Sequence, residues 1–79
     1  MRIQLLLFAG LRDAAGVPAM TLECPFGATV ASVLADERLR PLRPFAPSLR
    51  FAVNEEFAGA DVRLAEGDVL ALLPPVSGG

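Results

Sequence analysis

The reactive group that this sequence offers is the end of its main chain. The last residues, Pro74-Pro75-Val76-Ser77-Gly78-Gly79, carry no charge and follow an apolar stretch, 69–73. Glycine has no Cβ, so Gly78-Gly79 can lie extended in a channel where other residues would clash. The two prolines fix φ and reduce the entropy lost on insertion. We expect residues 74–79 to form a flexible tail that presents the Gly79 carboxylate to the active site of another protein.

Side chains offer little chemistry of their own. The sequence contains no His, Tyr or Trp and a single cysteine, Cys24. Without His, the usual general base near neutral pH is missing. One cysteine cannot form an internal disulfide and is far from a metal-binding set. We therefore expect this chain to bind no metal or cofactor, and we interpret Cys24 as a small buried hydrophobic residue rather than a sulfur relay.

The composition predicts one small domain over residues 1–79. A chain of this size buries only about 60–65% of its unfolded surface, so a deep enclosed active site is not expected. Hydrophobic residues make up 53% of the chain and the mean hydropathy is +0.50, so part of the apolar surface is expected to face a partner. The net charge of -2 argues against nucleic acid. No apolar stretch approaches a membrane span, and the single cysteine suits a reducing cytoplasm.

The first half of the chain predicts a hairpin followed by a helix. Residues 3–8 form a nearly continuous apolar strand, Gly10, Asp13 and 16–18 mark a loop, and residues 20–24 alternate as a second strand. Thr29 is the expected N-cap of a helix that ends by Arg40. The helix is expected to cover one sheet face with Val30, Val33, Leu34 and Leu39. Pro41, Pro44 and Pro47 then indicate an irregular connection.

Three more strands are expected in the second half. Residues 49–53 alternate, Asn54-Glu55 can turn the chain, and residues 56–58 form a short edge strand. Gly67 is expected to take a positive φ in the turn before the last strand, 69–73. The order β-β-α-β-β-β predicts an α+β fold with a mixed sheet of four to five strands and one main helix.

The pattern alone leaves the position of several apolar side chains open. Phe8, Phe51, Phe57 and Leu73 are all candidates for the core. Phe8 and Leu73 are also our candidates for an outer patch that binds a partner, because the first and last strands carry more apolar residues than one small core needs.

The sequence resembles the MoaD/ThiS sulfur carriers, which have the β-grasp or ubiquitin-like fold. Within that family it is most similar to the small subunits of molybdopterin synthase. Three segments carry the resemblance: 5–13, Ala52-Val53-Asn54, and Glu66-Gly67-Asp68-Val69 running into the tail. Two departures are visible: Leu72-Leu73 where the family often has aromatic residues, and acidic Glu55-Glu56.

The resemblance implies a chemistry for the tail. An E1-like enzyme would use ATP and Mg²⁺ to adenylate Gly79, and sulfur would then replace the adenylate to give a thiocarboxylate. The tail, with Pro74, Pro75, Val76, Ser77 and Gly78 as further contact residues, would enter the large synthase subunit and donate sulfur to a pterin precursor. The catalytic groups would belong to the large subunit, in a heterotetrameric synthase, and this chain would act as a carrier.

Three alternatives remain open. The chain is also consistent with a sulfur carrier for thiamine or another sulfur-containing product. It is consistent with a ubiquitin-like modifier joined to target lysines through Gly79, although chains built on its own side chains are excluded because all seven basic residues are arginine. The last alternative is an interaction module whose tail has no chemical role.

Overall fold

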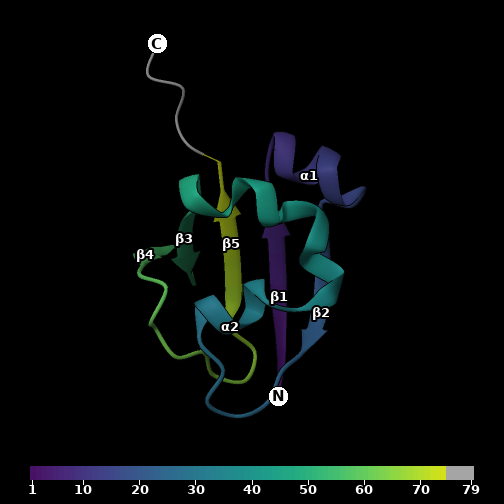
Figure 1. Ribbon diagram of the computed structural model, residues 1–79. Coiled ribbons are helices and arrows are strands. Elements are labelled where there is room, and N and C mark those ends of the chain that lie inside the picture. The colour runs from purple at the N-terminus through teal and green to yellow at the C-terminus, as the bar shows by residue number, and fades with distance from the viewer. Residues whose placement is uncertain (75–79) are drawn as a thin grey trace.

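The computed structural model describes residues 1–74 and shows a five-stranded sheet with helical segments packed against it (Figure 1). The strands are β1 (Arg2–Leu7), β2 (Ala19–Glu23), β3 (Arg50–Val53), β4 (Glu56–Ala58) and β5 (Val69–Leu73). The helices are α1 (Gly10–Ala15) and α2 (Val30–Leu34), followed by a 3₁₀ helix, η1 (Glu37–Ser48). This is the α+β β-grasp architecture, and it confirms the expected mixed sheet.

The sheet places the first and last strands side by side at its centre. Its order is β2-β1-β5-β3-β4, with β1 parallel to β5 and the other neighbours antiparallel. Leu7 of β1 pairs with Leu72 of β5, so the carboxyl ends of these two central strands lie at the same end of the sheet. The predicted edge strand is confirmed, since β4 lies at one end of this order.

The segment between β1 and β2 is a short helix, not the loop that we predicted. α1 follows Ala9, whose φ is 51°, and ends at Gly16, which has φ 81° and donates its N–H to the Arg12 carbonyl. A left-handed glycine after the last turn is a common helix terminus. Leu11 is fully buried and anchors the helix. A helix of six residues is too short to show a 3.6-residue period, which explains the wrong prediction.

The predicted helix from Thr29 to Arg40 is divided in two. Thr29 is the N-cap as expected, and it shares a capping box with Ser32. Asp36 has an extended backbone, and its carboxylate accepts the Arg38 N–H at 2.8 Å, so this residue ends the α-helical region and caps η1. The prediction of one helix ending by Arg40 was therefore wrong, and η1 begins three residues before Arg40.

The proline-rich connection is also regular rather than irregular. Pro41, Pro44 and Pro47 recur every three residues, the period of a 3₁₀ helix, and all three are exposed. Leu39 and Leu42 have the same spacing on the buried side. Because proline lacks an N–H, it cannot supply the donor of an α-helical turn, but it can lie on the outer side of a tighter one.

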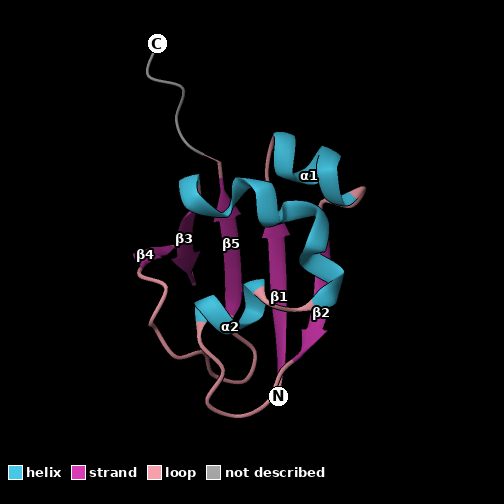
Figure 2. Cartoon of the chain, viewed as in Figure 1, coloured by secondary structure: helices cyan, strands magenta, loops and turns pink. Residues whose placement is uncertain are grey.

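The core lies between η1, α2 and one face of the sheet (Figure 2). The buried cluster is entirely aliphatic: Ile3, Leu5, Leu7, Leu11, Leu22, Val30, Val33, Leu39, Leu42, Leu64, Leu70 and Leu72. Of the helix residues predicted to cover the sheet, Val30, Val33 and Leu39 are buried and Leu34 is half-buried against them. Within residues 1–74, no helix has the length and apolar character needed to cross a membrane.

Candidate functional site

The beginning of β5 is fixed by a hydrogen-bond cluster around Asn54 and Asp68. The Asn54 side chain donates to Asp68 Oδ1 at 2.9 Å and accepts the Val69 N–H at 2.9 Å, while the Asn54 N–H donates to the Val69 carbonyl at 2.8 Å. Asp68 Oδ2 accepts the Ala65 N–H at 2.7 Å. Together these bonds set where β5 begins against β3 and therefore where its other end leaves the sheet.

The two predicted turns beside this cluster are confirmed. Asn54 and Glu55 have φ of 51° and 71°, which is the geometry of a type I′ hairpin turn between β3 and β4. Gly67 has φ 82°, as expected, and its N–H donates to the Arg2 carbonyl at 2.8 Å. A residue with a Cβ would be strained at Gly67, so this turn explains why glycine precedes Asp68.

The far end of β5 carries the predicted tail. Leu73 pairs with Arg50 of β3 and is half-buried, and Pro74 follows it, also half-buried, at the edge of the sheet where β1 ends (Figure 1). The remaining predicted site residues, Pro75, Val76, Ser77, Gly78 and Gly79, lie outside the described residues. The structure thus shows where the tail begins.

Among residues 1–74, no helix covers one of the two faces of the sheet, and we call this face the outer face. Strand alternation places Leu6, Ala71 and Leu73 opposite their buried neighbours Leu5, Leu70 and Leu72. The outer face is largely apolar between its polar margins, with Ala19, Leu6, Ala71, Ala52 and Phe57 aligned across all five strands by direct pairing. Such a continuous apolar row on an uncovered sheet is typical of an interaction surface.

Phe8 lies next to this surface at the tail end. It is 44% exposed and follows β1 directly, one residue past the Leu7–Leu72 pair, as Leu73 does on β5. The structure therefore brings the two predicted partner-binding residues to the same end of the sheet, where β1 and β5 both finish. The next residue, Ala9, has φ 51° and ψ −128°, a conformation that only glycine adopts easily. Strain of this kind concentrates at functional sites.

Phe57 and Arg50 belong to the same surface and were missed as site residues. We named Phe57 as a core candidate, but it is 74% exposed on β4, and the Arg50 guanidinium carbon lies 5.8 Å from the centre of its ring. The edge position of residues 56–58 was the signal that could have found it, because an edge strand of three residues has little core to cover. Phe51, the fourth candidate, is half-buried and packs against the core, as that interpretation required.

Cys24 has the properties of a structural residue. Its side chain is half-buried and packs against the core, as the strand alternation predicted. Burial, and secondarily the negative charge of Asp36, raise the pKa of the Cys24 thiol above its ordinary value. A protonated thiol is a weak nucleophile near neutral pH. Asp36 itself has a lowered pKa, chiefly because the Arg38 side chain donates a hydrogen bond to it.

No group of three or more His, Cys, Asp or Glu side chains in residues 1–74 is arranged to hold a metal ion. The described surface offers features suited to binding: an apolar sheet face, and beside it Arg50, which forms no ion pair within residues 1–74.

Comparison with known proteins places this geometry in a family. The ThiS family model matches residues 5–79. The chain is 36% identical to the molybdopterin synthase sulfur carrier subunit of Arabidopsis thaliana, covering 100% of this chain and 84% of that protein. It is 35% identical to the protein of the same name from Chlamydomonas reinhardtii, with 100% of both covered. The crystal structure of SAMP1 from Haloferax volcanii, the small archaeal modifier protein 1, superimposes with a TM-score of 0.83 at 28% identity and full coverage of both chains.

Proposed function

Because this chain belongs to the ThiS family, we propose that it is a sulfur carrier protein and the small subunit of a molybdopterin synthase. The observation that carries this proposal is the match to two molybdopterin synthase sulfur carrier subunits over the whole chain, tail included. These relatives favour the molybdenum pathway over thiamine synthesis. The expected partners are the large synthase subunit and an E1-like adenylating enzyme, in the cytoplasm.

In the proposed cycle, the Gly79 carboxylate is activated by the partner enzyme. A carboxylate is a poor electrophile, so sulfur cannot displace its oxygen directly. Attack of the carboxylate oxygen on ATP gives an acyl adenylate and pyrophosphate, and a sulfur nucleophile then displaces AMP to leave a thiocarboxylate. In this proposal ATP and Mg²⁺ are bound by the activating enzyme.

The structure supports this division of labour in two ways. The body provides an apolar docking face beside the start of the tail, with Phe8 and Leu73 at the same edge. Residues 76–79 can extend by about 13–14 Å, enough to cross the wall of a partner's pocket. We propose that the body binds the large subunit through the outer face while Pro74, Pro75, Val76, Ser77 and Gly78 guide Gly79 into its active site.

The test is the intact mass of the full chain after incubation with the activating enzyme, ATP and a sulfur source. Exchange of one oxygen for sulfur at Gly79 is expected. Deleting Gly78-Gly79, or adding one residue after Gly79, should abolish transfer to the large subunit while leaving the melting temperature nearly unchanged. The reason is that one residue shifts the reacting carbonyl by about 3.3–3.6 Å, and an offset of 1 Å can cost roughly 100-fold in rate.

An unmodified terminus, or normal transfer by the extended chain, would contradict the carrier role.

The similarity to SAMP1, which is named a modifier, favours a second candidate function: attachment of Gly79 to lysines of other proteins. It uses the same activated carboxylate but a different acceptor. Mass spectrometry of trypsin-digested cell extracts for lysines that carry residues 64–79, the peptide left after cleavage at Arg63, compared between cells with and without this chain, would separate the two.

A further inference from the structure

We propose that the β4 edge of the sheet, together with the cleft that opens beside it between β3 and β4, binds an extended segment of the large synthase subunit, in which a carboxylate is flanked by apolar side chains. This inference rests on the proposed function and adds a second docking element to it, beside the outer face. Four observations on residues 49–60 carry it.

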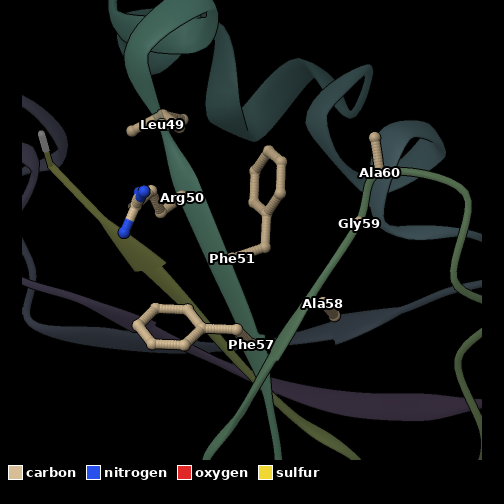
Figure 3. Close-up of a pocket in the computed structure, with 7 residues that line it drawn as sticks. All are labelled: Leu49, Arg50, Phe51, Phe57, Ala58, Gly59 and Ala60. Carbon is tan, nitrogen blue, oxygen red and sulfur yellow. The ribbon is translucent and has the colours of Figure 1, made fainter.

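The first observation is the cleft itself. β3 and β4 pair through Phe51 and Ala58 and then diverge, leaving a hollow of about 490 Å³ between Leu49-Arg50 on one side and Gly59-Ala60 on the other (Figure 3). Figure 3 shows the Phe51 ring standing in this gap. The volume is sufficient for several side chains, and its floor is apolar.

The second observation concerns charge. Arg50 is the one charged residue among the seven that line the cleft. Within residues 1–74 it forms no ion pair, and its guanidinium lies over the Phe57 ring instead. A guanidinium held over an aromatic ring is preorganised for a carboxylate brought by a partner. Because the charged residue in the lining is the positive Arg50, we expect the bound segment to carry an acidic side chain.

The third observation is the free edge of β4. Val53 and Glu56 close the two-residue turn, and hydrogen-bonded pairs alternate along an antiparallel ladder. The pairs Val53–Glu56 and Phe51–Ala58 thus use their main-chain groups between the strands, and Phe57 directs its N–H and carbonyl outward. No strand of the described chain pairs with that edge. An exposed edge of this kind accepts an extended segment by strand addition.

The fourth observation is continuity with the proposed docking face. Phe57 is aligned with Ala52 and Ala71 on the outer face, and Arg50 pairs directly with Leu73, the last strand residue before the tail. A partner that covers the outer face and receives the tail therefore reaches the cleft without a gap. We therefore infer that the bound segment belongs to the large subunit, which in the proposed cycle also receives the tail.

Binding of the large subunit to the full chain tests the proposal by titration calorimetry. Arg50→Glu and Phe57→Ser should each lower the affinity about tenfold or more, and Arg50→Lys, which keeps the charge but not the planar guanidinium over the Phe57 ring, should lower it less than Arg50→Glu does. The matched controls are Arg63→Glu, beside Thr29 at the start of α2, and Phe26→Ser, at an aromatic that is 84% exposed in the loop before α2. Both controls should bind as the unchanged chain does. All four positions are exposed, and thermal melting should confirm that each of the five variants folds.

Amide hydrogen exchange gives a second, direct measurement. The Phe57 amide should exchange freely in the isolated chain and become protected in the complex, because strand addition gives it a hydrogen-bond partner. Unchanged exchange at Phe57, or normal affinity of both Arg50→Glu and Phe57→Ser, would overturn the β4 edge as a docking site while leaving the carrier role intact. Absence of binding by the unchanged chain would overturn the proposed function as well.

Discussion

The two faces of β5 have nearly the same chemistry but different surroundings. Leu70 and Leu72 are completely buried under η1 and α2, while Val69, Ala71 and Leu73 lie on the outer face and are half-buried. A strand with one face in water normally alternates apolar and polar residues, and β5 does not. The fold requires only the buried face to be apolar. The apolar character of the other face therefore needs another cause, and the docking of a partner that we propose above would be such a cause.

Truncating one side chain on each face of β5 should show that the buried face contributes more to the free energy of unfolding. Leu72→Ala should lower the free energy of unfolding by about 2–5 kcal/mol, because it leaves a cavity in a well-packed aliphatic core. Leu73→Ala, at the adjacent position, should cost about 1 kcal/mol or less. Urea denaturation of both variants measures the difference. Equal losses would show that the outer face is part of the core and would remove the comparison.

A charged side chain placed on or beside the outer face should weaken binding to the large subunit. Leu73→Asp or Phe8→Asp should weaken binding to the large subunit roughly 10–100-fold, because a carboxylate without a partner at a dry interface is costly. The fold should survive, since both positions are at least partly exposed. Calorimetric titration beside thermal melting makes the measurement. If both folded variants bind normally, the outer face is not the docking surface.

The Asn54–Asp68 cluster determines which residues of β5 point to which face. Shifting a strand by one residue exchanges its two faces, so the register has to be fixed. Asn54→Ala removes the two side-chain hydrogen bonds and places a less tolerant residue at φ 51°, and it should cost about 1–2 kcal/mol. Unfolding by urea measures this, and Thr21→Ala, at an exposed position of β2, is a suitable control. A loss no larger than that of the control would mean that other contacts hold the register.

Cys24 gives the smallest expected effect. Cys24→Ser should leave sulfur loading of Gly79 unchanged, since the thiol is half-buried and its raised pKa keeps it protonated near pH 7. A raised pKa lowers the thiolate fraction at a given pH, so alkylation of the native chain should be slower than that of a free thiol and should accelerate only at alkaline pH. Loss of loading in a folded Cys24→Ser variant would make Cys24 a relay.

The parts of the fold that were predicted correctly have local causes. The Thr29 cap, the Asn54-Glu55 turn and the positive φ of Gly67 each depend on a few neighbouring residues. The strand positions follow from short runs of apolar residues. The wrong predictions involved competition between neighbours: Asp36 caps a new helix instead of continuing the old one, and three prolines at a spacing of three specify a 3₁₀ helix.

The candidate site could be predicted only in part. Phe8 and Leu73 were proposed from an excess of apolar residues, but Phe57 and Arg50 were not, because their place beside the outer face depends on which strands pair. The sequence of residues 56–58 does not indicate that β4 has a neighbouring strand, β3, on one side only. The cleft likewise arises from the divergence of two strands, which is a property of the sheet and has no signature in the spacing of residues.

In the proposed cycle the tail is drawn into another protein, and the central parallel pair, β1 and β5, has a mechanical consequence for that step. A pull on the tail acts along the axis of β5, which is held by β1 on one side and β3 on the other. The ladder bonds on both sides are then sheared together, and none can be opened singly as they would be if the strand were peeled from an edge. The sheet should therefore stay folded under a force that straightens the tail. The carrier could then leave one partner and bind the next without unfolding.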